Sequence, residues 1–277
     1  MKAAKLVLED GTQFCGWSFG YDTNTSGEVV FNTAMTGYPE SLTDPSYAGQ
    51  ILVTTYPLIG NYGVPDTGIG SNGLPLFMES EKIHPKALVV ADYSETYSHW
   101  NARESLAAWL QHEKIPAITG IDTRRLTKIL REHGVMRGEV IVESGELTKA
   151  RPESEDYGSV NWVEQVSCKE VITYQAEGEK KHRVVLVDCG VKANIIRCLI
   201  KRGIEVVRVP WDYDFNQLEF DGLFLANGPG DPEQCSKTVA NIRAFLSNAQ
   251  VKPCMGICLG NQLLAKAAGT YREFCRL

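Results

Sequence analysis

Short apolar runs alternate with amphipathic stretches along the last hundred residues of the chain. The apolar runs lie at residues 183–187, 204–209, 222–226 and 251–257, and they have the length and β-branched content of buried strands. Helical spacing follows the first run up to Gly203 and returns over Lys237–Asn248. Strands that alternate with helices predict a parallel sheet with helices on both faces. Such sheets bind ligands outside the carboxyl ends of their strands, so the turns after the third and fourth runs are candidate sites.

The first half of the chain has a mixed pattern that predicts an α+β domain. Strand-like runs lie at Lys5–Leu8, Glu28–Thr33, Ile51–Tyr56, Ala87–Ala91 and Glu139–Val142. One helix is expected over Asn101–Lys114. A second helix is expected to begin after Asp122, as the N-cap, and to end at Gly134. The dipeptide Asp10-Gly11 is typical of a type I′ hairpin turn after the first strand.

A charged stretch separates these two patterns. The sequence therefore predicts an N-terminal domain over residues 1–145, a linker over 146–182 and a second domain over 183–277. Residues 68–73 fit the Gly-x-Gly-x-x-Gly pattern of dinucleotide-binding loops. The strand and helix that such a loop needs are missing, since prolines stand at 65 and 75, so we do not expect nucleotide binding there.

Composition and charge exclude several kinds of partner. The 277 residues carry a formal net charge of −6, which argues against a basic nucleic-acid-binding face. Glu9 and Asp10 interrupt what would be the apolar core of a signal peptide, and the apolar runs are far shorter than the roughly 18 residues of a membrane span. The eight cysteines show no C-x-x-C spacing. We therefore expect a cytoplasmic protein with free thiols, no metal site, and neither nucleic acid nor membrane as a partner.

The strongest candidate for chemistry is a cysteine after the fourth apolar run. Residues 256–260 read Gly-Ile-Cys-Leu-Gly, the pattern of a sharp strand-to-helix turn with a nucleophile at its apex. The following helix would favour a Cys258 thiolate by at most about 2 kcal/mol, so a general acid–base partner, usually histidine, is still required. The alternative is that Cys258 is merely a small buried residue of a tight turn. Cys254 is expected to belong to the core.

The turn after the third run is unusually rich in glycine and proline. Residues 227–232 read Asn-Gly-Pro-Gly-Asp-Pro. Glycines allow backbone N–H groups to approach a ligand closely, as an oxyanion hole requires. The alternative is a stiff connection between a strand and a helix. Because this turn and Cys258 follow neighbouring strands, we expect them to form one site.

Together these two motifs resemble a class I glutamine amidotransferase. In that family the elbow cysteine attacks the side-chain amide of glutamine, ammonia leaves, and water releases glutamate from the thioester. The resemblance implies that Cys258 is the nucleophile and that backbone N–H groups of Gly228 and Leu259 hold the oxyanion. It also implies that Gly230 and Gln262 help to bind the substrate.

The first half is similar to the N-terminal domain of the carbamoyl-phosphate synthetase small chain. The similarity is carried by residues 27–33, 35–40, 42–47, 55–63 and 121–127, the last reading Ile-Asp-Thr-Arg-Arg-Leu-Thr. It implies that Ser46 reaches the glutamine site. It further implies a subunit without its own cofactor that passes ammonia to a large subunit, which uses ATP and Mg²⁺ to make carbamoyl phosphate for arginine and pyrimidine biosynthesis. The chain has no G-x-x-x-x-G-K-[ST] phosphate loop, in agreement with that division of labour.

The chain departs from this family after the elbow helix. In the family, later strands carry the histidine and glutamate that complete the triad, whereas residues 270–277 here do not resemble that continuation. The histidines stand at 84, 99, 112, 133 and 182, none in the matching position. We therefore expect a truncated doubly wound parallel-sheet domain with some exposed apolar surface, and a chain that is inactive or nearly so alone. The alternatives are an inactive fragment that docks on the large subunit, and a cysteine hydrolase for another amide.

Overall fold

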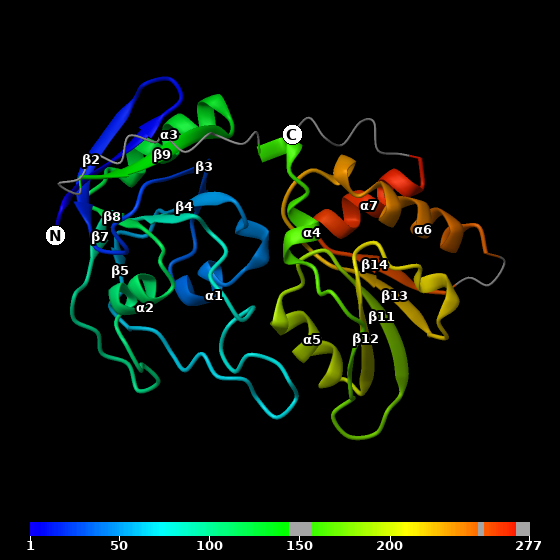
Figure 1. The fold of residues 1–277 in the computed structure, drawn as a ribbon. Coiled ribbons are helices and arrows are strands. Elements are labelled where there is room, and N and C mark those ends of the chain that lie inside the picture. Colours follow the sequence, from blue (N-terminus) through cyan, green and yellow to red (C-terminus); the bar gives the residue numbers. More distant parts are fainter. Residues whose placement is uncertain (144–156, 249–251, 270–277) are drawn as a thin grey trace. The chain divides into compact units, whose positions relative to one another are not determined.

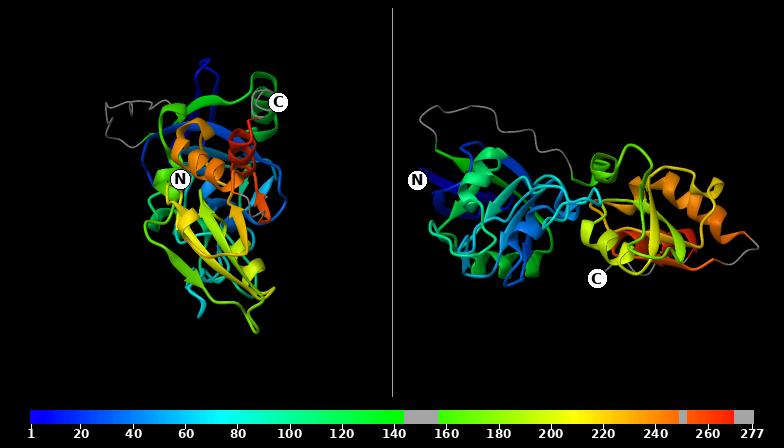
Figure 2. Two further views of the ribbon diagram at one scale, coloured as in Figure 1. Left: turned by 90° about the vertical axis from the view of Figure 1, so that its right-hand side faces the viewer. Right: turned by 90° about the horizontal axis from the view of Figure 1, so that it is seen from below.

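The computed structural model describes residues 1–143, 157–248 and 252–269, which form two compact units (Figures 1 and 2). The first unit contains residues 1–68 and 76–157, and the second contains residues 69–75 and the chain from Gly158 onward. Part of the predicted linker, residues 146–156, lies outside the described residues. The rest of it carries a short helix α4 (Trp162–Val166) and a strand β10 (Ile172–Tyr174), neither of which the sequence pattern predicted.

Seven strands of the first unit close into a barrel in the order β1-β2-β8-β6-β4-β3-β9. Their bounds are β1 Ala3–Leu8, β2 Gln13–Ser18, β3 Thr25–Asn32, β4 Gln50–Thr54, β6 Ala87–Val89, β8 Ala117–Thr119 and β9 Met136–Val142. Strands β3, β4, β6 and β8 run parallel to one another, and the remaining pairings are antiparallel. Every barrel strand contributes to one interior cluster, which includes Leu6, Val29, Ile51 and Ile118.

Three helices complete the first unit. They are α1 (Tyr38–Leu42), α2 (Leu106–His112) and α3 (Thr123–His133), and a small sheet pairs β5 (Leu58–Ile59) with β7 (Asp92–Tyr93). The apolar residues of α3, Leu126 and Leu130, join the barrel's interior cluster, whereas α1 and α2 pack with a separate cluster that contains Leu52 and Leu88. Since successive residues of a strand face opposite ways, the two clusters occupy opposite sides of the barrel wall.

The sequence predicts the ends of α3 correctly but the type of the first hairpin turn wrongly. Asp122 caps α3, with its Oδ1 accepting a hydrogen bond from the N–H of Arg125 at 2.8 Å, and Gly134 ends the helix with φ 82°. The predicted helix over Asn101–Lys114 begins later, because Ser105 is the cap of α2. The hairpin of β1 and β2 forms, but the predicted type I′ turn is wrong. That turn needs positive φ at both central residues, and here Gly11 has it while Asp10 does not.

The second unit is built on a five-stranded sheet in the order β10-β12-β11-β13-β14. The strands β11 (His182–Asp188), β12 (Ile204–Pro210), β13 (Gly222–Leu225) and β14 (Cys254–Gly256) are parallel, as predicted, and β10 adds an antiparallel edge. Helix α5 (Ala193–Ile200) packs on one face, and α6 (Ser236–Leu246) and α7 (Leu259–Ala267) pack on the other (Figure 1). Strand β14 forms the other edge, where Met255 is 57% exposed.

The Gly-x-Gly-x-x-Gly segment belongs to the second unit from Ile69 onward. Its backbone turns back on itself, since Gly70 N–H donates to Leu74 O at 2.8 Å and Ile69 bridges to Pro75. Leu74 is 3% exposed and packs in the cluster under α5. No strand enters the segment and no helix leaves it, as expected, so its glycines serve a compact loop that anchors on the sheet.

Candidate active site

Cys258 is held in a strained backbone conformation between β14 and α7. Its φ of 52° and ψ of −115° lie outside the regions that side-chain-bearing residues favour, and Lys114 is the only other non-glycine with positive φ in the described parts of the chain. Such strain costs roughly 1–3 kcal/mol and persists where the surroundings enforce it. The Cys258 side chain is exposed. The alternative of a buried structural cysteine is therefore wrong.

The two flanking glycines are what allow this turn. A Cβ on Gly260 would lie 2.2 Å from Leu225 O and 2.8 Å from Ala226 O, and one on Gly256 would lie 2.6 Å from the carbonyl carbon of Gly260. Contacts shorter than 3.0 Å to backbone atoms are not tolerated without a shift of the main chain. The first turn of α7 therefore packs directly on the end of β13, and this packing fixes the apex.

The start of α7 leaves a backbone donor beside the sulfur. Gln262 N–H donates to Cys258 O at 3.1 Å and Asn261 N–H donates to the same oxygen at 3.0 Å, which closes the first turn. The N–H of Leu259 has no backbone acceptor among the described residues. Cys258 caps the helix without a side-chain hydrogen bond, so the positive end of α7 faces the site uncompensated. Leu259 itself is buried, whereas Gln262 is exposed.

The Gly-Pro-Gly turn lies at the same edge of the sheet. Strands β13 and β14 are parallel neighbours, with Leu225 paired to Gly256, so the two turns leave from strand ends about 4.8 Å apart. Gly228 is packed so closely that a Cβ there would lie 1.9 Å from Cys189 O. Gly230 has φ 81° and faces the ring of Trp162. The structure thus brings Cys258, Leu259, Gly228, Gly230 and Gln262 to one edge.

The buried carboxylate of Asp188, which the sequence pattern did not predict as important, stabilises a turn at this edge. Asp188 ends β11 with no exposure, and its Oδ1 accepts the N–H groups of Gly190 and Val191 at 2.9 and 2.8 Å. Its Oδ2 accepts Arg208 Nη2 at 2.6 Å in an ion pair. The turn held in this way is the one against which Gly228 packs, and Asn227 Nδ2 donates to Gly190 O at 3.0 Å. The sequence pattern that could have identified Asp188 is a lone acidic residue at the end of an apolar run.

Four other cysteines of the second unit are poor nucleophiles because they are buried or partly buried. Burial raises the pKa of the Cys254 thiol to about 11 and those of Cys168 and Cys235 to about 12. Cys189 is fully buried, and its pKa is raised well above its ordinary value by the same loss of hydration. Only the thiolate is a nucleophile, so these thiols are inert near neutral pH. Cys254 also packs against the core, as predicted.

Neither Ser46 nor a histidine stands beside Cys258 within the second unit. Ser46 belongs to the first unit, in the turn Pro45–Tyr47, where its N–H donates to Asp44 Oδ1 at 2.9 Å. His182 begins β11, while Cys258 follows the carboxyl end of β14. The registers place them about seven residue steps apart, or roughly 23 Å along the strands. The other four histidines belong to the first unit.

Known proteins share sequence with nearly the whole chain. Residues 6–140 match the CPSase domain of the carbamoyl-phosphate synthase small chain, and residues 185–272 match class-I glutamine amidotransferases. The arginine-specific small chain of carbamoyl phosphate synthase from Eremothecium gossypii is 49% identical over 97% of this chain and 68% of its own length. Among solved structures, an aminopeptidase from Aneurinibacillus sp. strain AM-1 is 12% identical over 96% of this chain and 69% of the aminopeptidase chain. Its TM-score of 0.30 is too low to inform the fold.

Larger proteins contain a similar sequence as one part. The multifunctional protein CAD from Squalus acanthias is 49% identical over 97% of this chain, and the mitochondrial carbamoyl-phosphate synthase [ammonia] from Homo sapiens is 46% identical over 98%. The chain spans 12% and 18% of their lengths, respectively. This chain covers more than two thirds of the Eremothecium small chain, and the two domain models match it one after the other. The chain therefore belongs to the carbamoyl-phosphate synthase small-chain family, with a class-I glutamine amidotransferase domain as its second part.

Proposed function

We propose that this chain is the glutamine-binding subunit of a carbamoyl-phosphate synthase and that Cys258 is its nucleophile. The observation that carries the proposal is the exposed, strained Cys258 at the end of β14, flanked by glycines that the packing requires. A cysteine that served only the fold would not need a backbone conformation that costs roughly 1–3 kcal/mol.

The geometry supports acyl transfer from the side-chain amide of glutamine. Cys258 Sγ attacks the amide carbon, and the carbonyl oxygen takes the negative charge. The N–H of Leu259, together with that of Gly228 on the neighbouring turn, would hold this oxyanion, and one such donor is worth about 10²–10³ in rate. The C–N bond then breaks, ammonia departs with a proton from a general acid, and water hydrolyses the thioester to glutamate.

The name of one group of relatives raises a second candidate function. The human relative is named for ammonia rather than glutamine. An ammonia-dependent enzyme does not need a nucleophile at the elbow, whereas this chain has cysteine there in an exposed position. The cysteine favours glutamine as the nitrogen source of this chain.

The general acid–base group is the part of the triad that the second unit does not provide among its described residues. His182 is at the opposite end of the sheet, as its register shows. General acid–base catalysis contributes roughly 10²–10⁴ in rate. We therefore propose that a polypeptide of these 277 residues binds glutamine but hydrolyses it slowly or not at all.

Two measurements on the purified chain separate binding from turnover. Covalent labelling by 6-diazo-5-oxo-L-norleucine, an electrophilic glutamine analogue, should modify Cys258, and free glutamine should protect it. Glutamate release should stay close to that of the Cys258→Ser variant. Labelling that glutamine does not block would reject the amidotransferase proposal in favour of another amide hydrolase, and rapid glutamate release abolished by Cys258→Ser would reject the proposed inactivity.

The proposed partner is a large synthetase subunit that consumes the ammonia. The support is the family, since the Eremothecium relative is named a small chain. Co-purification with a large subunit, without glutaminase activity, would favour a docking module, the second reading of this chain. Failure of the full chain to associate would count against both the partner and the docking role.

A further inference from the structure

The barrel of the first unit has a carboxyl edge of its own, and a pocket opens there. Parallel strands β3, β4, β6 and β8 all end at this edge, and the residues just beyond three of them, Thr33, Thr55 and Ala91, line the pocket. Helix α3, which follows β8, supplies most of the remaining wall, and Pro57, Ile121 and Asp122 complete it. The volume is about 520 Å³, within the range of pockets that hold small molecules.

The cations on this wall repel one another, and one of them also opposes the helix dipole. Helix N-termini favour acidic side chains, yet the first turn of α3 has none and carries Arg124 instead. Lys128 and Arg131 follow on the same face, at spacings where like charges repel by a few tenths of a kcal/mol. None of these three cations has an ion pair or hydrogen bond among the described residues. An anion in the pocket would relieve both penalties.

The one carboxylate that lines the pocket is already engaged. Asp122 caps α3 through the N–H of Arg125 at 2.8 Å. Three cations and one carboxylate therefore leave a local excess of two positive charges, in a chain whose net charge is −6. The excess is a feature of this pocket and not of the surface in general.

Hydroxyl donors and an apolar floor complete the lining. The hydroxyls of Thr33, Thr55 and Thr123 form no hydrogen bonds within the described part of the chain, and Thr123 is only 4% exposed. Pro57 and Ile121 give the pocket an apolar side. Arginine and lysine beside several hydroxyls match the oxygens of a phosphate group, and the apolar side suits a carbon skeleton.

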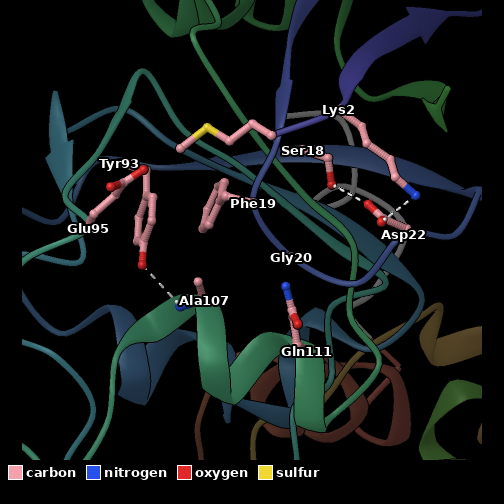
Figure 3. Close-up of a pocket in the computed structure, with 10 residues that line it drawn as sticks. Lys2, Ser18, Phe19, Gly20, Asp22, Tyr93, Glu95, Ala107 and Gln111 are labelled. Atoms are coloured by element: carbon pink, nitrogen blue, oxygen red, sulfur yellow. Dashed lines mark hydrogen bonds and ion pairs between the residues drawn. The ribbon is translucent and has the colours of Figure 1, made fainter. Parts of the chain in front are cut away.

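A second pocket of the same unit lacks these properties. It is lined by residues of β2, α2 and the chain start, and has a volume of about 450 Å³ (Figure 3). Its cation, Lys2, is paired with Asp22 at 2.9 Å, and Asp22 also accepts a hydrogen bond from Ser18 (Figure 3). With its cation neutralised and Glu95 on its wall, this pocket offers an anion no net attraction.

We propose that the pocket at the carboxyl edge of the barrel binds a phosphate-bearing small molecule. Arg124 and Lys128 hold the phosphate, the threonine hydroxyls donate to its free oxygens, and the organic part lies along Pro57 and Ile121. The pocket belongs to the first unit, whereas Cys258 belongs to the second. The small subunit would thereby carry a second ligand site of its own.

Calorimetric titration of the full chain with ribose 5-phosphate tests the proposal. The phosphate ester should bind and ribose should not, since ribose has the carbon skeleton without the charge. The Arg124→Gln/Lys128→Gln double variant should bind about tenfold or more weakly, the loss expected for two charge-assisted contacts. Both side chains are exposed and glutamine is a good helix former, so the melting temperature should not fall.

Lys2→Gln is the matched control, because it removes one positive charge from the other pocket of the same unit. It should leave the affinity for ribose 5-phosphate unchanged. The proposal is overturned by an absence of binding at about 10 mM, by equal affinity of the double variant, or by a loss of binding with Lys2→Gln instead. Succinate that binds as tightly as ribose 5-phosphate would also overturn it, since the site would then recognise any dianion.

Discussion

Each unit of this protein has one edge where parallel strands end, and the two edges present opposite chemistry. The edge of the second unit has an exposed thiol, and the backbone segments of Leu259 and Gly228 lie at the same edge. The edge of the barrel has three cations and three free hydroxyls and no nucleophile. In the second unit the backbone is strained and close-packed around Cys258. In the barrel the side chains of α3 provide the functional groups.

The difference shows how a common geometric rule leads to different functions. Ligands bind where parallel strands end because strand ends and helix starts converge there without filling the space. What is bound depends on the residues just beyond the strands. Glycines permit a close approach of main chain to a small amide, whereas long cationic side chains suit a larger, charged ligand. The contrast can be tested at both edges.

The largest expected effect concerns two thiols four residues apart. With a thiol-alkylating reagent at pH 7.5, Cys258 should react readily and Cys254 should not, because a thiol of pKa about 11 is ionised to roughly one part in 3,000 at that pH. Burial raises the pKa of Cys254, so its reaction rate should increase about tenfold per pH unit until pH 11. Peptide mapping by mass spectrometry measures both. Equal rates at pH 7.5 would show that Cys254 is not buried as described.

A second test addresses the packing of the elbow. Gly260→Ala should destabilise the second unit by about 3 kcal/mol, because the new Cβ would lie 2.2 Å from Leu225 O. Gly158→Ala is the control, since a Cβ there has no atom within 4 Å, and its effect should stay within about 0.5 kcal/mol. Urea unfolding followed by circular dichroism gives both values. A mild effect of Gly260→Ala would mean that α7 does not pack on the end of β13.

The smallest expected effect is a pH dependence of stability in the first unit that the second unit should lack. Burial lowers the pKa of His84 in the first unit to about 4. Between pH 6.5 and 4 the unfolded chain therefore binds a proton that the folded unit does not, so stability falls as the pH falls through this window. The expected loss is roughly 1–3 kcal/mol. The unfolding free energy measured at pH 7 and pH 4.5 should show it, and His84→Gln should reduce the difference.

The partly buried His84 side chain has a hydrogen-bonding partner in the first unit. Its Nε2 lies 2.9 Å from Ser80 Oγ, which also donates to Thr43 O. If the pH dependence persists in His84→Gln, other groups of the unit cause it. The second unit has no corresponding histidine, because His182 is largely exposed in its pairing with Asp221.

Much of the second unit could be predicted from the sequence because its signals are local. Four parallel strands read as short apolar runs, and helices α5, α6 and α7 follow them with the expected spacing. The elbow was predictable because Gly256 and Gly260 are needed by the turn itself. The roles assigned to Cys258 and Gly228 stay predictions, although the structure brings both to one edge.

The closure of the barrel could not be predicted from local sequence patterns. Its closure depends on β1 pairing with β9 and β2 pairing with β8, contacts between residues a hundred or more positions apart. The short strands β2 and β8 carry weak patterns of their own. Likewise, Arg124 and Lys128 read as ordinary residues of an amphipathic helix until four strand ends converge beside them.

The sequence by itself determined the caps and glycines that shape each turn, the apolar runs that become strands, and the family to which they belong. Only the tertiary structure decided which turns meet at one edge, that the Cys258 side chain is exposed, and that the cations of α3 line a pocket. Residue types act on their neighbours in the chain, whereas exposure, ionisation and the shape of a site depend on segments that come together only when the sheets form.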